Sequence, residues 1–208
     1  MPRVSAAAAT AEIARRDPVM AGLIERAGPL RIRPPRDPDP FVDLAESIAY
    51  QQLAGRAAAA IWTRVAAMFD GGITPERVLA TPDEAFRAAG FSGAKTRSVK
   101  DLADKVLTGV VPVDRLRRMR DDEIIERLSL VRGIGPWTAQ MFLIFTLRRM
   151  DVWPVLDYGV RNGYRIAYRL PELPTPKALE AEGERFRPYR TVAAWYCWRA
   201  VELGAEEG

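Results

Sequence analysis

The sequence predicts an all-α fold of two helical lobes with a cleft between them. Apolar residues recur at helical spacing along almost the whole chain, and helix-capping residues precede many of these segments. No alternating pattern of useful length predicts a strand, and no repeat of fixed period occurs. Because the chain has 208 residues and is 48% hydrophobic, it can bury a sizeable core.

The first two predicted helices have clear starts and stops. Ser5 can cap a helix that runs to about residue 16. An Asp-Pro pair at residues 17–18 is typical of a second helix start, and Gly28 is expected to end that helix. Residues 29–40 contain five prolines, so this stretch predicts an extended connector and not a helix.

The rest of the chain predicts a series of further helices. Residues 41–69 show helical spacing with Gly55 as the break between two helices, and the Thr-Pro pairs at residues 74–75 and 81–82 predict two more helix starts. The remaining expected helices are one capped by Ser92 over residues 93–107, a short one over 113–119, one capped by Asp121 that runs to 128, an apolar one that ends at 147, and three over 158–168, 177–186 and 189–203.

Two absences restrict the chemistry. The chain has no histidine, which excludes Ser-His and Cys-His catalysis and any zinc site that contains histidine. Its single cysteine, Cys197, cannot form an intramolecular disulfide or hold an iron-sulfur cluster. Cys197 lies among aromatic residues, which predicts a buried and inert thiol. We expect no metal site, and the chemistry is left to carboxylates, arginines, lysines, hydroxyls and aromatics.

The charge and hydropathy favour a soluble intracellular protein. The net charge of +4 and the pI of about 9.4 are compatible with nucleic-acid binding, although charge alone favours an ordinary solvated basic surface. No apolar run reaches the roughly 18 residues that would predict a membrane span. The first residues resemble a helix more than a signal peptide. We therefore expect no membrane partner.

A glycine-rich hairpin separates two predicted helices. In Arg132-Gly133-Ile134-Gly135-Pro136, the two glycines allow a tight turn with unusual dihedrals and the proline opens a helix. The N–H groups at such a helix start can bind an anion, for example a DNA phosphate. The alternative is an ordinary helix connection, which a bare Gly-x-Gly pattern would favour on its own. Helices on both sides, with Ile134 as a core anchor, favour the anion-binding reading.

The run LVRGIGPWTAQMFLIFTL, followed by DVWPVLDYGVRNGY, resembles the helix-hairpin-helix and Gly/Pro-rich Asp (HhH-GPD) motif of the DNA glycosylase superfamily. Within it, the similarity is greatest to the AlkA-type 3-methyladenine DNA glycosylase II group, and it spans residues 41–201. Arg132 departs from the motif, because many members have proline there. The resemblance implies that Arg132, Gly133, Gly135 and Thr138 contact DNA. It also implies a structural monovalent cation at the hairpin carbonyls and no other cofactor.

The resemblance implies the helix-hairpin-helix DNA glycosylase fold in a single domain over residues 1–208. We expect residues 1–40 to hold the N-terminal helices and connector, 41–119 a helical lobe with a DNA wedge, and 120–208 the hairpin and the catalytic region. The short N-terminus implies that the additional β-domain of larger AlkA enzymes is missing.

The family places its essential aspartate about twenty residues beyond the hairpin, and Asp157 matches that position. A carboxylate there can stabilise the positive charge that develops on the sugar, or orient and deprotonate a water. The alternative role for Asp157 is a helix N-cap that binds the amide of Gly159 or Val160, and both roles can coexist. Asp151 is the competing carboxylate and is expected to be a solvated loop residue.

Trp137 bears on the type of reaction. In relatives similar to endonuclease III, a lysine at this position attacks the sugar as an amine, and tryptophan cannot do so. The resemblance therefore implies a monofunctional enzyme that leaves an abasic site.

An enzyme that acts on a base within a duplex must extrude the base and hold it by stacking. Aromatic faces also attract a cationic purine. The residues that match the family's base pocket, or lie near it, are Trp137, Trp198, Met141 and Tyr158. Met141 falls where AlkA itself has tyrosine, which leaves the substrate range open. Trp195 and Tyr196 are expected to be core residues of the last helix.

The segment before Gly55 matches the DNA wedge of the family. Leu53 is expected to enter the minor groove and fill the gap left by the extruded base, and Gln52 beside it is expected to contact the DNA. The alternative is a core leucine at a helix end. Lys95 lies at a helix start, where its ammonium and the backbone N–H groups can meet one phosphate, although such a lysine is often only a solvated surface charge.

These observations predict a monofunctional DNA glycosylase of the 3-methyladenine type II class that acts in base excision repair. We expect it to extrude alkylated purines, such as 3-methyladenine or 7-methylguanine, from damaged double-stranded DNA and to hydrolyse the N-glycosidic bond. The alternatives are a glycosylase for a deaminated or other lesion and a helix-hairpin-helix DNA-binding module with no chemistry. We expect a monomer that is associated with the nucleoid in a bacterial-type cytoplasm.

Overall fold

The computed structural model describes residues 4–32 and 39–206, and all regular secondary structure within these ranges is helical. The predicted all-α class is therefore confirmed. The expected connector at 29–40 lies partly outside the described residues, since 33–38 are not among them. No helix in the described ranges combines the length and apolarity that a bilayer-spanning segment needs.

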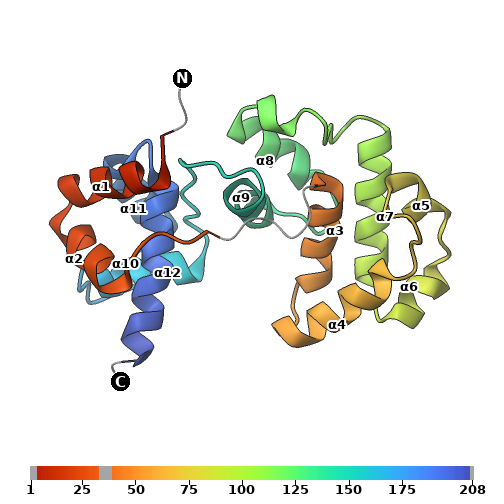
Figure 1. The fold of residues 1–208 in the computed structure, drawn as a ribbon, viewed down its shortest axis with the longest axis horizontal. Helices are drawn as coiled ribbons and strands as arrows, with labels where there is room; N and C mark the ends of the chain where they lie inside the picture. Colours follow the sequence, from red (N-terminus) through yellow and green to blue (C-terminus); the bar gives the residue numbers. More distant parts are fainter. Residues whose placement is uncertain (1–3, 33–38, 207–208) are drawn as a thin grey trace. The chain divides into compact units, whose positions relative to one another are not determined.

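The chain forms two compact units, each with its own core. The terminal unit combines residues 1–33 with 143–208, and the central unit comprises residues 34–142 (Figure 1). The predicted parts grouped the hairpin with the C-terminal residues, whereas in the structure the hairpin belongs to the central unit. Sequence order alone does not reveal that the N-terminal helices return to the C-terminal ones.

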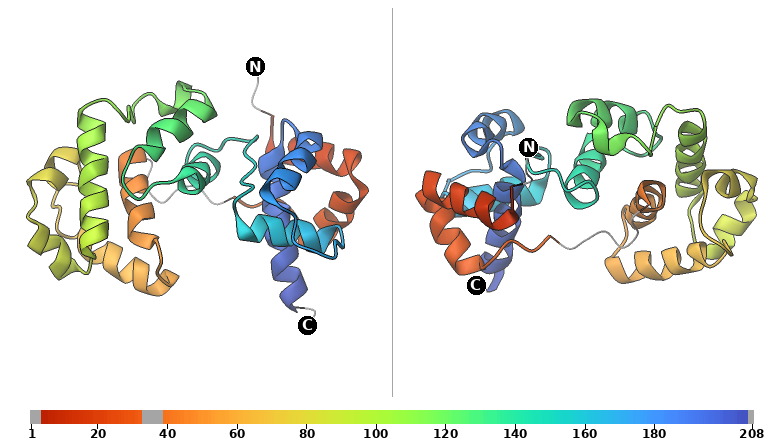
Figure 2. Two further views of the ribbon diagram at one scale, coloured as in Figure 1. Left: turned by 180° about the vertical axis from the view of Figure 1, so that it is seen from behind. Right: turned by 45° about the horizontal axis from the view of Figure 1, so that its top comes forward.

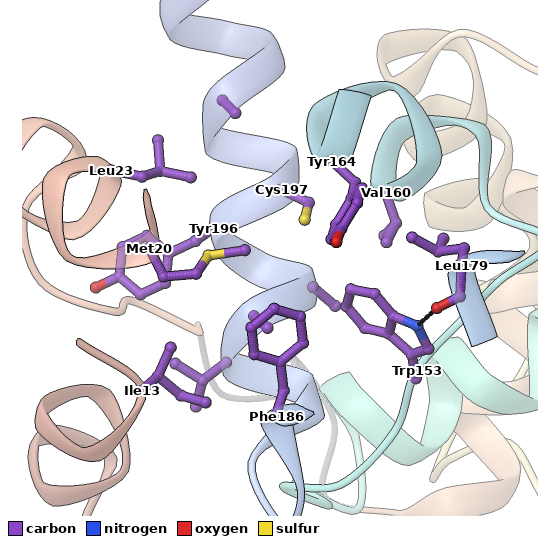
Figure 3. Packing of buried hydrophobic residues seen from close by; sticks show 14 of the residues in the cluster. Ile13, Met20, Leu23, Trp153, Val160, Tyr164, Leu179, Phe186, Tyr196 and Cys197 are labelled. Atoms are coloured by element: carbon purple, nitrogen blue, oxygen red, sulfur yellow. Dashed lines mark hydrogen bonds between the residues drawn. The ribbon is translucent and has the colours of Figure 1, made fainter. Parts of the chain in front are cut away.

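The terminal unit is built around its longest helix. Figure 3 shows α12 (Arg190–Glu206) running between α1 and α2 on one side and α10 on the other. The helices around it are α1 (Ala6–Arg16), α2 (Pro18–Ala27), α10 (Tyr158–Ala167), α11 (Pro176–Gly183) and the short 3-10 helix η2 (Glu184–Phe186). Ser5 and Asp17 cap α1 and α2 through their side chains, as predicted.

The core of this unit is apolar and densely packed (Figure 3). Met20 and Tyr196 are fully buried, and the Tyr196 hydroxyl donates to the carbonyl oxygen of Gly28 at 2.9 Å. The Trp153 indole nitrogen donates to the carbonyl oxygen of Leu179 at 2.7 Å. Cys197 is fully buried, which confirms its predicted burial, and burial raises the pKa of its thiol.

Helices α10 and α12 approach each other very closely. A Cβ atom on Gly163 of α10 would lie 1.8 Å from the carbonyl oxygen of Cys197 on α12. No side chain can occupy that space, and because the obstacle is backbone, no rotamer change would relieve the overlap. Gly163 therefore determines how near the α12 backbone comes to α10.

The central unit packs shorter helices around α7 (Gly93–Leu107). Figures 1 and 2 show α3 on one side of α7 and α5 and α6 on the other. The other helices of this unit are α3 (Pro40–Tyr50), α4 (Gly55–Ala66), α5 (Pro75–Ala80), α6 (Asp83–Ala89), η1 (Leu116–Arg118), α8 (Asp121–Ser129) and α9 (Pro136–Phe145), whose last turn enters the terminal unit. Ser92 caps α7 as predicted.

Several predicted boundaries differ from the structure. The helix expected over residues 113–119 is only the three-residue 3-10 helix η1 (Leu116–Arg118). Asp121 is the first residue of α8 and not its cap, which is Arg120. Gly55 begins α4, and the break itself lies at residues 51–54.

Candidate active site

Asp157 is the N-cap of α10 in the terminal unit. Its side chain is buried, with the residue only 8% exposed, and Oδ1 accepts a hydrogen bond from the N–H of Val160 at 2.8 Å. The capping role considered for Asp157 is therefore real. It fixes the side-chain rotamer and holds an acidic group at the positive end of α10.

A second donor reaches the same carboxylate from α12. The indole nitrogen of Trp198 donates to Oδ1 of Asp157 at 2.9 Å. Trp198 is half-buried, and its ring stacks on Phe145 with 5.8 Å between centroids and 25° between planes. The indole is thus held by a polar contact at its nitrogen and by an aromatic contact at its face.

Apolar side chains adjoin Asp157 in the chain. Leu156 is 57% exposed and Tyr158 is 67% exposed, although the carboxylate between them is buried. Phe145, on which Trp198 stacks, is also exposed. Exposed apolar groups beside a buried carboxylate are typical of a binding site. Leu156 and Phe145 were not among the site residues predicted from the sequence.

Two predicted pocket residues lie on α9. These are Trp137 and Met141. They lie four residues apart, and Phe145 follows four residues later, which places all three along one face of this helix. Trp137 is exposed and Met141 is half-buried. Because both belong to the central unit, their part in a base pocket stays a prediction.

The hairpin lies between α8 and α9. Gly133 has φ +77°, and a Cβ at this position would come within 2.8 Å of Ser98 Oγ. Ile134 is buried, which confirms it as the core anchor. Gly135 has no positive φ and open space around it, so the prediction of unusual dihedrals holds for Gly133 alone. Thr138 is half-buried in the first turn of α9.

Arg132 has an exposed side chain, and its backbone is anchored to α7. Its N–H donates to Oδ2 of Asp101 at 2.7 Å, and the Lys105 ammonium lies 2.6 Å from Oδ1 of the same residue. Burial of this carboxyl opposes its ionisation, but the two donors outweigh that effect and lower the pKa of Asp101. The guanidinium of Arg132 therefore projects from a backbone held in one position.

A pocket of about 240 Å³ in the central unit brings together four of the predicted DNA-binding residues, with Gln51 and Ser92 in its lining. The Gln51 side chain donates from Nε2 to the carbonyl oxygen of Gly133 at 2.9 Å, which joins the loop before α4 to the hairpin. The four are Gln52, Lys95, Arg132 and Gly133.

Lys95 makes hydrogen bonds that the sequence did not predict. Its ammonium donates to the carbonyl oxygen of Ala49 in the last turn of α3 at 2.6 Å, and its N–H donates to Ser92 Oγ. Burial lowers the pKa of this ammonium. The alternative of a merely solvated surface charge does not hold, because Lys95 stabilises a helix C-terminus while it lines the pocket, and its phosphate contact stays a prediction.

Leu53 lies in the loop between α3 and α4 and is 40% exposed. The alternative of a core leucine is therefore wrong. Its neighbour Gln52 has φ +57°, a left-handed conformation that costs a residue with a Cβ about 1–2 kcal/mol. Leu53 directly follows this strained residue.

Asp151 is not the solvated loop residue that was expected. Its carboxylate accepts from Nε of Arg190 at 2.8 Å and from Nη1 of Arg187 at 3.0 Å. The adjacent Arg-Arg-Met run gave no indication of these partners, which lie more than thirty-five residues further along the chain. Asp151 thus ties the start of α12 to the irregular segment before α10.

The hairpin carbonyls suit the monovalent cation that the resemblance implies. The carbonyl oxygens of Val131 and Gly133 each accept a hydrogen bond, from the Ile134 N–H and from Gln51. A carbonyl oxygen has two lone pairs, so each keeps capacity for a singly charged ion. No group of three acidic or sulfur ligands that could hold a metal occurs within residues 4–32 and 39–206. The cation itself stays a prediction.

A known protein family matches most of the chain. The model of the HhH-GPD superfamily base excision DNA repair proteins matches residues 45–188. The chain belongs to this family. The matched segment contains the hairpin, the exposed loop at Leu53 and the capped carboxylate of Asp157, and it ends before Trp198.

Individual HhH-GPD relatives agree with the family match. The chain is 40% identical over 168 residues to DNA-3-methyladenine glycosylase 1 of Schizosaccharomyces pombe, covering 79% of this chain and 74% of that protein. The structure of the S. pombe 3-methyladenine DNA glycosylase Mag1 in complex with abasic DNA has a TM-score of 0.80 at 37% identity and covers 94% and 97% of the two chains. A DNA-3-methyladenine glycosidase from Bacillus halodurans has a TM-score of 0.86 at 36% identity, covering 96% of this chain and 91% of that one.

Proposed function

We propose that this chain is a monofunctional DNA glycosylase that removes alkylated purines from double-stranded DNA and leaves an abasic site. The observation that carries the proposal is the Asp157 carboxylate, held by the Val160 N–H and the Trp198 indole in a chain of the HhH-GPD family. Relatives that are 40% and 36% identical over the matched residues are named DNA-3-methyladenine glycosylase 1 and DNA-3-methyladenine glycosidase, which favours alkylated purines as substrates.

Asp157 has the chemistry that glycosidic hydrolysis needs. When the N-glycosidic bond breaks, its electron pair leaves with the base and C1′ of the sugar becomes positively charged. A fixed carboxylate stabilises that charge and accepts a proton from the water that attacks C1′. An alkylated purine in DNA carries a positive charge and leaves as a neutral base. Its departure therefore needs little further acid catalysis. One carboxylate is therefore enough for such a substrate.

The aromatic groups near Asp157 suit a cationic base. Trp198 and Tyr158 carry ring faces that attract positive charge, and Trp198 is already held against the carboxylate. The family pattern also assigns Trp137 and Met141 on α9 to base binding. Differences here, such as Met141 in place of an aromatic residue, would alter which lesions are preferred.

The central unit supplies groups that can hold the duplex. Arg132 and the hairpin amides suit a backbone phosphate, and exposed Leu53 suits the gap left by an extruded base. The relative solved with abasic DNA supports a DNA ligand for this fold. We further propose that the protein acts on intracellular DNA as a monomer, without a catalytic cofactor.

Strand cleavage by an amine is not part of this proposal. A lyase reaction needs a lysine at the sugar, and Trp137 occupies the hairpin position where bifunctional relatives carry it. Lys95, Lys100 and Lys105 on α7 are bound to Ala49, Asp83 and Asp101. The expected product is an abasic site in an intact strand.

The test is base release from a duplex treated with a methylating agent, with the released bases identified by mass spectrometry. Wild type should release 3-methyladenine and 7-methylguanine, and Asp157→Asn should release neither while it still binds the duplex. Asparagine keeps a capping oxygen, so the loss would report the charge and not the fold. Normal turnover by Asp157→Asn would exclude the proposed role. Release only from a deaminated duplex would favour another lesion, and no release from any duplex would favour a non-catalytic DNA-binding module.

A further inference from the structure

We infer that Gly159 is a positioning residue whose missing side chain allows the Trp198 indole to reach Asp157. The inference rests on the proposed function for its catalytic consequence, although its geometric part stands independently of activity. Gly159 is the second residue of α10, two residues after Asp157.

The space that a side chain would need at Gly159 is already occupied. A Cβ there would lie 2.8 Å from Cδ1 of Trp198, 3.1 Å from its Nε1 and 3.1 Å from Oδ1 of Asp157. These three atoms are the donor nitrogen, its ring neighbour and the acceptor of the indole-carboxylate hydrogen bond. A methyl group at residue 159 would therefore intrude on that bond.

Trp198 cannot easily retreat from such a methyl group. Its ring stacks on Phe145, and its backbone follows Cys197, whose carbonyl is held against Gly163 of α10. The two glycines are four residues apart, so both face α12. The absence of a side chain at Gly163 lets the α12 backbone lie close to α10, and the absence of one at Gly159 leaves room for the indole of Trp198. The indole must then tilt away from Asp157 or α10 must shift.

A tilt would change the site without removing the N-cap. The Val160 N–H would still bind Oδ1 of Asp157, but the carboxylate would lose the donor from α12. Its orientation toward the sugar would then be less constrained. Since misplacement of a catalytic group by about 1 Å can cost on the order of a hundredfold in rate, we expect a large loss of turnover from a single methyl group.

The experiment combines Gly159→Ala with Trp198→Phe in a double-mutant cycle. In the wild-type background, Gly159→Ala should lower kcat for 3-methyladenine release by about tenfold or more, with KM changed less. Phenylalanine keeps an aromatic ring but lacks the N–H, so in the Trp198→Phe background the added methyl group should cost much less. Gly22→Ala is the control, because Gly22 is an exposed helical glycine with nothing within 4 Å of the added Cβ. It should keep wild-type kcat and raise Tm by about 2–4 °C.

The indole N–H resonances give a readout that needs no activity. The chain has five tryptophans, and Trp198→Phe identifies the Trp198 signal by its disappearance. Gly159→Ala should move that signal, and Gly22→Ala should not. If Gly159→Ala folds only in the Trp198→Phe background, the steric conflict is demonstrated directly.

An unmoved Trp198 resonance in folded Gly159→Ala would overturn the inference, as would equal loss of kcat in both backgrounds or failure to fold in both. The failure of the proposed function looks different. Wild type and Gly22→Ala would then release no methylated base at all, and the resonance shift alone would decide the role of Gly159.

Discussion

The carboxylate of Asp101 on α7 accepts a hydrogen bond from the backbone N–H of Arg132, with 2.7 Å between Oδ2 and the nitrogen. The contact joins the longest helix of the central unit to the glycine hairpin. It also fixes the residue immediately before Gly133, whose left-handed backbone is the turn itself. The hairpin therefore depends on an ionised side chain of another element for its position.

This dependence predicts a contribution to acid sensitivity. The folded-state pKa of Asp101 lies below its ordinary value of 3.8, so its stabilising effect is complete above that value and is lost as the pH falls through the folded-state pKa. Between about pH 5 and about pH 2.5, wild type should lose more unfolding free energy than Asp101→Asn. Urea unfolding at both pH values measures this, with Asp104→Asn on the exposed face of α7 as the control. An identical loss in wild type and Asp101→Asn would contradict the prediction.

The two hairpin glycines should respond differently to a methyl group. Gly133→Ala should lower the free energy of unfolding by about 1–2 kcal/mol or more, because alanine disfavours a positive φ and its Cβ would meet Ser98. Gly135→Ala should change stability by about 0.5 kcal/mol or less, because the space around it is open. It should nevertheless weaken DNA binding if the duplex approaches the hairpin there. Denaturant unfolding and duplex titration separate the two effects, and equal destabilisation by both variants would count against this assignment.

Leu53 should matter for lesions and not for folding. Leu53→Ala should leave the free energy of unfolding almost unchanged, since the residue is 40% exposed, and should weaken binding to a duplex with an abasic analogue by about tenfold. Undamaged duplex should be affected less. Leu107→Ala is a matched control in the same unit, because that leucine is 46% exposed at the end of α7. Equal weakening for damaged and undamaged duplexes would argue against a wedge.

Asp151 should affect stability and leave the chemistry unchanged. In Asp151→Ala the half-buried Arg190 loses the nearer of its acidic partners and keeps Glu184 at 3.9 Å, which should cost about 1–3 kcal/mol of unfolding free energy. Turnover per folded molecule should match wild type, measured below the lowered Tm. A loss of turnover comparable to that of Asp157→Asn would show that the competing carboxylate takes part in the reaction.

Two substitutions of Asp157 should separate its capping role from its proposed catalytic role. Asp157→Ala removes the N-cap of α10 and should destabilise the protein by about 1 kcal/mol, whereas Asp157→Asn should retain most of that stability. Neither variant should release methylated bases. Thermal unfolding and single-turnover base release together test this. If base release fell only in proportion to the loss of stability in the two variants, Asp157 would act only as a cap.

The sequence by itself determined the helices and most of their starts. Ser5, Asp17 and Ser92 cap the helices that were predicted for them, because a capping side chain bonds to amides two or three residues away. The turn at Gly133 was predictable for the same reason, since a positive φ is a property of one residue. Asp157 was singled out by the spacing that the family resemblance supplied.

Only the tertiary structure decided which distant groups meet. Asp157 binds Trp198 across 41 positions, Lys95 binds Ala49 across 46, and Asp151 binds Arg190 across 39. Helical periodicity specifies which face of a helix is buried, but it contains no information about the partner on the facing helix. The need for glycine at residues 159 and 163 follows from the distance between α10 and α12, and that distance exists only once both helices have packed.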